Sequence, residues 1–178
     1  QGPLERTGRN LDVAIEGRGF FQVIDQDSGE IMYTRVGRFD IDANGNLVYG
    51  IRNHAWLIEP AITIPAEATE IHIGSDGSVD YRQPGSDTLA NAGQLQLAVF
   101  ANEGRLVRSG DGLYAATADG SGVPTSDVPG ARGFGKLRQG CLEASNVNPL
   151  DEQRRVEECR LMLRRLRRLL PPEMADVE

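Results

Sequence analysis

The stretch RQGCLEASNVNPLDEQRRVEECRLMLRRLRRLL, residues 138–170, decides the fold because the spacing of its apolar residues changes in the middle. Before Asn148, apolar and polar residues alternate in twos, which is typical of β-strands; after it, apolar residues recur every three or four positions, as in an α-helix. Asn148 can act as an N-cap, and Pro149 suits the first helical position because its missing N–H would be unpaired there anyway. The sequence therefore predicts a β-rich chain followed by one helix over residues 149–170.

The predicted helix carries a narrow apolar seam whose members recur at spacings of 3, 4, 3 and 4 residues, the rhythm of a coiled coil. Full burial would let each aliphatic side chain of the seam contribute about 1.5–3 kcal/mol. The helix could pack back on its own domain. Seven flanking arginines and the lack of a second heptad seam in the chain favour a helix that needs a partner chain. The seam consists of Val156, Cys159, Leu163, Leu166 and Leu170.

The length and the composition are those of an ordinary globular chain. Its 178 residues suit one domain, or one domain with an appendage, and the 21 glycines indicate many tight turns. Two cysteines, Cys141 and Cys159, give neither a disulfide framework nor the spacing of metal ligands. No apolar run is long enough to span a membrane, and residues 1–10 lack the pattern of a cleaved secretory signal.

The net charge of −7 is unevenly distributed. Residues 1–148 hold 12 basic and 19 acidic residues, whereas residues 149–178 hold 7 of each. An acidic body argues against a surface for nucleic acid, and the arginines of the helix alternate with glutamates and with the seam. We therefore expect no nucleic-acid partner.

Between residues 11 and 143 the chain reads as a series of short strands joined by turns that contain glycine. Asn44-Gly45 is a strong hairpin signal because both positions tolerate a positive φ. Prolines at both ends make residues 60–65 an edge strand rather than a central one. The pattern predicts a mainly β fold, rich in hairpins. Loops are expected at residues 82–93 and 117–135.

One loop resembles a calcium site. Asp40, Asp42, Asn44 and Gly45 match the first positions of an EF-hand loop, which supplies oxygens at positions 1, 3 and 5 and turns at a glycine. Position 12 should be a bidentate glutamate, but it is Ile51, and the flanking residues read as strands. A plain hairpin turn is the better interpretation, so no metal site is predicted.

No pattern of a catalytic or cofactor site is present. His54 and His72 are the only histidines, and neither has a ligand partner at a suitable spacing. The pair Gly17-x-Gly19 precedes Phe20-Phe21 rather than a helix, which excludes a phosphate loop. Nucleophile elbows, P-loops and zinc motifs are absent from the sequence. We therefore expect no enzyme and no cofactor.

Five ordered segments together resemble the axial proteins of the bacterial flagellar rod and hook, and most closely the distal-rod branch of that family. The resemblance covers nearly all of residues 4–148. The segments are LDVAIEGRGFFQV at 11–23, YTRVGRFDIDANGNLV at 33–48, ITIPAEATEIHIGSDGSV at 62–79, GQLQLAVFANEGRLVRSGDGLY at 93–114 and LRQGCLEASNVN at 137–148.

The resemblance implies a structural subunit that polymerises helically into a hollow shaft with copies of itself and with other axial proteins. It further implies a mostly β outer domain, terminal helices that coil together, and export through the flagellar type III apparatus without a cleaved Sec signal. Gly17, Gly19, Asn44 and Gly45 would hold turns, Phe20 and Phe21 would fill the core, and Ser145, Asn146, Val147 and Asn148 would join the body to the helix.

Two departures from the family are visible. Members of the family begin with a helical segment, which this sequence lacks, and their C-terminal helix is richer in amides and poorer in arginine. We therefore expect that an N-terminal part is missing and that the C-terminal helix has diverged. The predicted parts are an N-terminal loop at 1–10, a β body at 11–143, a joint at 144–148, the coil-forming helix at 149–170 and a tail at 171–178.

The sequence thus predicts a subunit of the flagellar basal-body rod, of distal-rod type, that transmits torque to the hook. The alternative is a β-rich binding module, adhesin-like or calcium-tuned, whose helix caps its own sheet.

Overall fold

The computed structural model describes residues 2–51, 54–117, 120–144, 160 and 162 of the chain. Its internal contacts divide the chain into a β-rich body, residues 3–144, and a second part that contains residues 145–178. In that second part the structure describes Arg160 and Met162, which both have α-helical backbone and are exposed. Otherwise the predicted helix at 149–170 lies outside the described residues.

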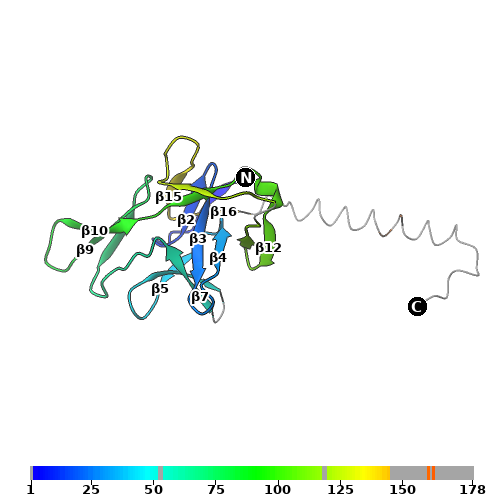
Figure 1. The fold of residues 1–178 in the computed structure, drawn as a ribbon. Coiled ribbons are helices and arrows are strands. Elements are labelled where there is room, and N and C mark those ends of the chain that lie inside the picture. Colours follow the sequence, from blue (N-terminus) through cyan, green and yellow to red (C-terminus); the bar gives the residue numbers. More distant parts are fainter. Residues whose placement is uncertain (1, 52–53, 118–119, 145–159, 161, 163–178) are drawn as a thin grey trace, which may run out of the picture. The chain divides into compact units, whose positions relative to one another are not determined.

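Short strands with intervening turns make up the described body (Figure 1). The strands are β1 (Leu4–Arg6), β2 (Val13–Glu16), β3 (Phe20–Asp25), β4 (Ile31–Thr34), β5 (Phe39–Ile41), β6 (Leu47–Ile51), β7 (His54–Glu59), β8 (Glu70–Ile73), β9 (Ser78–Arg82), β10 (Leu89–Gln94), β11 (Leu97–Val99), β12 (Val107–Gly110), β13 (Leu113–Ala115), β14 (Thr125–Asp127), β15 (Lys136–Gln139) and β16 (Cys141–Glu143), with one 3₁₀ helix, η1 (Glu103–Arg105).

These strands form four antiparallel sheets. The largest runs β12-β13-β4-β3-β7-β6-β5, with β11 beside β3 and β14 beside β11. A three-stranded sheet has the order β10-β9-β8, and two ribbons pair β15 with β2 and β1 with β16. In Figure 1, β9 and β10 lie at one end of the body and β12 lies at the opposite end.

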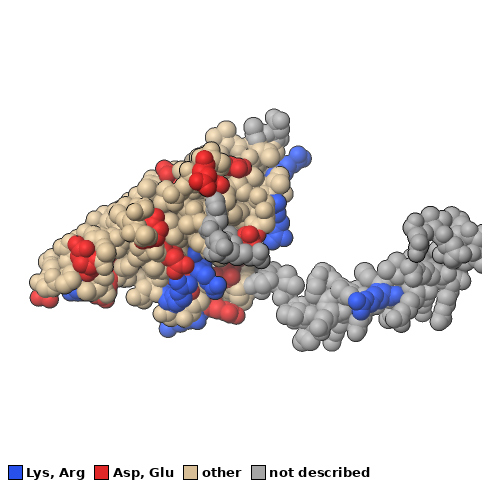
Figure 2. Space-filling view, turned by 90° about the horizontal axis from the view of Figure 1, so that it is seen from below, with Lys and Arg blue, Asp and Glu red and all other residues tan. Residues whose placement is uncertain are grey.

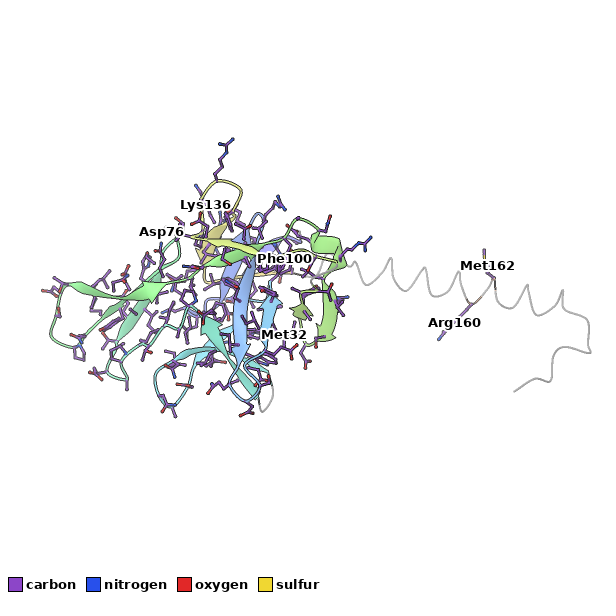
Figure 3. All side chains as sticks on the ribbon, viewed as in Figure 1. Met32, Asp76, Phe100, Lys136, Arg160 and Met162 are labelled. Atoms are coloured by element: carbon purple, nitrogen blue, oxygen red, sulfur yellow. The ribbon has the colours of Figure 1, made fainter. Side chains whose placement is uncertain are left out.

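The strand β3 has both of its faces buried, because successive side chains of a strand point to opposite faces. Phe21 enters the main core, where its ring packs edge-on against Phe39 at 5.0 Å between centroids. Phe20 enters a second, smaller cluster and packs edge-on against Tyr114 at 5.7 Å. Figure 3 places Met32, from the main core, inside the body. A mainly β, hairpin-rich body is thus confirmed.

Several predicted loops contain strands. Residues 1–10 were expected to be a loop, but β1 forms there because it pairs with β16, the last strand of the body in the sequence. The strands β10 and β14 likewise lie in segments expected to be loops. Apart from Leu4 and Leu89, the residues of these strands are polar or small. No alternation of apolar residues therefore marks them, and only pairing with another strand makes them β.

Residues 60–65 form no regular strand, contrary to the prediction. The segment instead lies along the turn between β5 and β6, where the N–H of Leu47 donates to the carbonyl of Ile62 at 2.9 Å and the N–H of Ile64 donates to that of Gly45 at 2.8 Å. One isolated bridge joins Asn46 to Thr63. Burial of Ile62 and Ile64, together with these two backbone hydrogen bonds, fixes this segment.

Within the described ranges, no helix has the length and apolar character needed to cross a membrane.

Candidate functional site

The ribbon of β1 and β16 holds the two ends of the body together. Leu4 faces Glu143 and Arg6 faces Cys141 in the register. Beyond the ribbon, the N–H of Ala144 donates to the carbonyl of Pro3 at 2.9 Å. Any segment that follows residue 144 therefore begins beside residue 3, which makes this ribbon the candidate site of assembly.

Arg35 fastens the ribbon to the large sheet. Its Nε donates to Glu143 Oε2 at 3.0 Å, its Nη1 donates to the carbonyl of Gly19 at 2.9 Å, and its Nη2 donates to that of Gly17 at 3.0 Å. Its guanidinium also lies 5.7 Å from the centroid of the Phe20 ring. The side chains of Arg35 and Glu143 are only 23% and 18% exposed, so water screens this pair less than a surface pair.

The planar fork of an arginine suits this position, because a lysine could not hold a carboxylate and two carbonyls in one plane. A hydrogen bond to a charged group contributes about 1.5–3 kcal/mol. Arg35 therefore ties the last strand of the body to the turn between β2 and β3.

A second ion pair lies close by and is more exposed. Arg18 donates to Glu103 Oε1 from Nε at 3.1 Å and from Nη2 at 2.9 Å, and its side chain is 60% exposed. The two pairs and Gly17 line a pocket of about 400 Å³. Exposed pairs contribute about 0–1 kcal/mol, so the pair of Arg35 is the stronger of the two.

The turn beside this pocket depends on glycine. Gly17 has a φ of +115° and Gly19 a φ of +132°, which side chains rarely adopt. A Cβ on Gly17 would lie 3.0 Å from the Cα of Gly135, and one on Gly19 would lie 3.1 Å from Leu97. Close packing of backbone on this turn leaves both carbonyls where Arg35 can reach them.

In the hairpin turn at Asn44-Gly45, the carboxylate of Asp42 accepts hydrogen bonds from the turn itself. Asp42 Oδ1 accepts the backbone N–H groups of Asn44 and Asn46, each at 2.8 Å, and Asp42 Oδ2 accepts the side-chain amide of Asn46 at 3.1 Å. Desolvation raises the pKa of Asp42, but these hydrogen bonds outweigh it and lower the pKa overall. Gly45 has a φ of +85°.

The other acidic residue of the calcium-like loop, Asp40, pairs with Arg9 at 2.7 Å. Both carboxylates that would have to hold a cation are thus engaged with the protein. In the part of the chain that the structure describes, no three His, Cys, Asp or Glu side chains lie close enough to hold a metal ion.

Several predicted site residues cannot be placed. The seam of Val156, Cys159, Leu163, Leu166 and Leu170 and the joint of Ser145, Asn146, Val147 and Asn148 lie outside the described residues.

The sequence did not single out Arg35 or Glu143. They are 108 positions apart, and each sits in an alternating stretch where a charged residue looks like an ordinary exposed one. Only the fold shows that the two meet. The one available signal was the position of Glu143 directly before the predicted joint.

Comparison with known proteins agrees with these features. The family model described as the D1 domain of the flagellar hook protein FlgE/F/G matches residues 14–81. The chain is 41% identical over 152 residues to the flagellar basal-body rod protein FlgG of Caulobacter vibrioides, which covers 85% of this chain and 56% of that protein.

The FlgG proteins of Buchnera aphidicola, from Acyrthosiphon pisum, and of Agrobacterium fabrum are 43% and 40% identical over the same length, again with 85% of this chain and 56% of the relative covered. The chain therefore spans about half the length of the curated relatives that it matches.

Proposed function

The chain belongs to the family of flagellar hook and rod proteins, and we propose that it is a structural subunit of the bacterial flagellar basal-body rod, of the distal-rod type. The observation that carries this proposal is the sequence identity of 41% with a basal-body rod protein over 152 residues. Its role would be mechanical rather than catalytic.

The structure supports a mechanical role through its terminal ribbon. In a shaft, each subunit must pass torque between its body and the segments that hold it to its neighbours. The ribbon of β1 and β16, anchored by Arg35, offers a connection with two strands and a half-buried ion pair. Such a connection resists bending more than a single extended chain would.

Assembly would proceed through the C-terminal part. The predicted helix at 149–170, about 22 residues long, would be only marginally stable alone in water, so it would gain order when its seam is buried between subunits. The parts proposed for this role are the joint at 144–148, the helix itself and the tail at 171–178. The partners would be further copies of the chain and other axial proteins in the basal body, reached through type III export without a cleaved signal.

Light scattering behind size exclusion, over a range of concentrations, tests the proposal. We expect the full chain to grow with concentration and a version stopped after Asn148 to remain monomeric. Leu163→Asp should abolish association, because it places a charge on the seam. Met162 is 67% exposed and lies off the seam, so Met162→Asp is the matched control and should leave association unchanged. Equal behaviour of Leu163→Asp and Met162→Asp would contradict the proposal.

A further inference from the structure

The body has strand edges of two kinds, which matters because an open edge with unpaired backbone groups is a template for another strand. The outer edge of β8 is closed by a side chain: the N–H of Ile73 donates to Gln139 Oε1 at 3.2 Å, and Gln139 Nε2 donates to the carbonyl of Ile71 at 3.0 Å. The outer edge of β5 is covered by residues 9–12, where the N–H of Phe39 donates to the carbonyl of Leu11 at 3.1 Å.

The edges of β10 and β12 are left open. Within the described ranges, β10 pairs only with β9, and β12 pairs only with β13. Each open edge presents one large aliphatic side chain to solvent, Leu89 at 48% exposure on β10 and Val107 at 52% on β12. The outer edge of β14 is also open, but its three residues are polar and one of them bonds to Gln22.

The two open edges lie at opposite ends of the body (Figure 1). A contact between them cannot form within one body, whereas it can form between the β10 end of one copy and the β12 end of the next. Such a contact is heterologous, and heterologous contacts that do not close into a ring produce helical filaments.

The end of the body that holds β10 is acidic, whereas the strand β12 carries an arginine, Arg108. Residues 67–94, which hold β8, β9 and β10, contain five acidic residues and one arginine, a net charge of −4. Residues 103–111, which hold η1 and β12, contain two arginines and two acidic residues, and one of these, Glu103, already pairs with Arg18. Figure 2 shows acidic side chains along the whole visible face of the body, with Lys and Arg side chains gathered mainly in the middle and toward the broad end.

One charged residue of each end is free to contribute. Asp87 precedes β10 and is exposed, and no ion pair of its carboxylate occurs among the described residues. Arg108 lies on β12, is exposed, and packs 5.8 Å from the centroid of the Tyr114 ring without an acidic partner in the described body. These two residues therefore place opposite charges at the two open edges, although Arg82 Nη1 also lies 3.2 Å from the carbonyl of Asp87.

We propose that β12 of one copy adds to β10 of the next copy, with Leu89 against Val107 and with Arg108 attracted to the acidic end that includes Asp87, as a head-to-tail contact between bodies. This contact rests on the proposed function and names the surface through which the bodies of successive subunits meet. Strand addition supplies main-chain hydrogen bonds, and the charges select the correct pair of edges. Because few residues take part, the contact is weak between two free chains and becomes effective once other segments hold the copies together.

Charge reversal in the full chain tests the contact. Asp87→Arg and Arg108→Asp should each weaken association about tenfold at low salt, because each places like charges together. The double variant should return association to within about threefold of the original, since every reversed edge then meets a reversed partner. The effect should shrink above about 0.15 M salt, where the screening length falls below about 8 Å.

Glu30 and Arg132 provide the matched control, because both are exposed and neither belongs to β10, β12 or the strands that pair with them. Glu30→Arg with Arg132→Asp keeps the same net charge and should leave association unchanged. The proposed contact would be overturned if the single variants associate as strongly as the original chain, or if the double variant associates more weakly than either single variant.

Disulfide trapping gives an independent measurement. In a background with Cys141→Ala and Cys159→Ala, a mixture of chains with Leu89→Cys and chains with Val107→Cys should form a covalent dimer under oxidant. Either chain alone should form little, because the contact pairs unlike edges. A dimer that forms equally well from one chain alone would contradict a head-to-tail arrangement.

The same data separate this contact from the proposed function. Association that Leu163→Asp abolishes, but that the edge reversals leave unchanged, rejects the edge contact and keeps the rod subunit. Association that responds to the edge reversals and not to Leu163→Asp keeps the edge contact and rejects the seam. A chain that stays monomeric at every concentration overturns both.

Discussion

The two outer strands of the three-stranded sheet, β8 and β10, differ in whether the backbone groups of their outer edges are hydrogen-bonded. The edge of β8 is closed by the amide of Gln139, which donates and accepts as a peptide group would. The edge of β10 has no such cover in the described body and displays Leu89. One sheet thus has one edge whose backbone groups are hydrogen-bonded by a side chain and another edge that is open within the described body.

This difference separates edges that serve folding from edges that serve association. Closing an edge needs a residue from elsewhere in the chain, here from β15, so it ties distant segments together and stabilises the body. An open edge adds little to the stability of the body. Substitutions at closed edges should therefore lower stability, and substitutions at open edges should leave stability almost unchanged.

The largest effect on stability is expected at Gly37, which precedes β5 and packs against Val13, next to the residues that cover the edge of β5. Gly37 accepts the N–H of Val13 at 2.8 Å, and a Cβ on Gly37 would overlap the carbonyl oxygen of Val13 and lie 2.9 Å from the Phe21 ring. Gly37→Ala should lower the free energy of unfolding by about 3 kcal/mol or more, measured by chemical denaturation. Gly104→Ala, where a Cβ would meet nothing within 4 Å, is the control. Similar losses in both variants would mean that close approach is not what Gly37 provides.

Removal of the cap on β8 should have the next largest effect. Gln139→Ala leaves the N–H of Ile73 and the carbonyl of Ile71 without their partner, and we expect a loss of about 1–3 kcal/mol in the same measurement. Gln94 stands on the open edge of the same sheet and donates to the carbonyl of Asp76 at 3.1 Å. Gln94→Ala should lower the free energy of unfolding by less than half as much as Gln139→Ala does. Equal losses in the two variants would contradict the distinction between the two edges.

A smaller effect with a pH signature is expected at the turn that joins β8 to β9. The backbone N–H and the hydroxyl of Ser78 donate to Asp76 and hold the pKa of Asp76 below 3.8. A carboxyl with a lowered pKa stabilises the fold at pH values above its unfolded pKa, and that contribution disappears as the pH falls through the folded pKa. Asp76→Asn should therefore be less stable than the original chain at pH 6, and the gap should narrow below pH 3.8.

Thermal unfolding at a series of pH values measures this gap, with Asp87→Asn as the control because no hydrogen bond to its carboxylate occurs within the described residues. A gap for Asp76→Asn that stays constant from pH 6 to pH 3 would show that its charge adds nothing to the stability of the turn.

The smallest effect on stability is expected at the open edge of β12. Val107→Lys replaces an exposed aliphatic side chain and should change the free energy of unfolding by less than about 0.5 kcal/mol. An edge lysine discourages strand addition, so association of the full chain should nevertheless weaken. Loss of stability above about 1 kcal/mol would mean that Val107 belongs to the core and that this edge is closed.

The sequence was sufficient to predict the mainly β class, because alternation and glycine turns are local signals. Asn44-Gly45 needs only its own neighbours to form a turn, and the fold places it in one. The strands β1, β10 and β14 were missed for the opposite reason. Apart from Leu4 and Leu89 their residues are polar or small, and each becomes a strand only through pairing with another strand.

The candidate site was predictable to a lesser degree. Arg35, Glu143 and Gln139 look like ordinary polar residues of alternating strands, and their roles depend on which segments meet. Register and edge position are properties of the whole sheet, so no local pattern contains them. The seam and the joint remain predictions from the sequence, since they lie outside the described residues.

The hydrogen bond between Ala144 and Pro3 has a consequence for how the chain can be rearranged. The whole body is a loop of chain whose two ends are 2.9 Å apart, donor to acceptor. Termini that lie side by side are the arrangement in which circular permutation and insertion of a domain are tolerated, so joining residues 3 and 144 by a short turn and opening the chain elsewhere should leave the body able to fold.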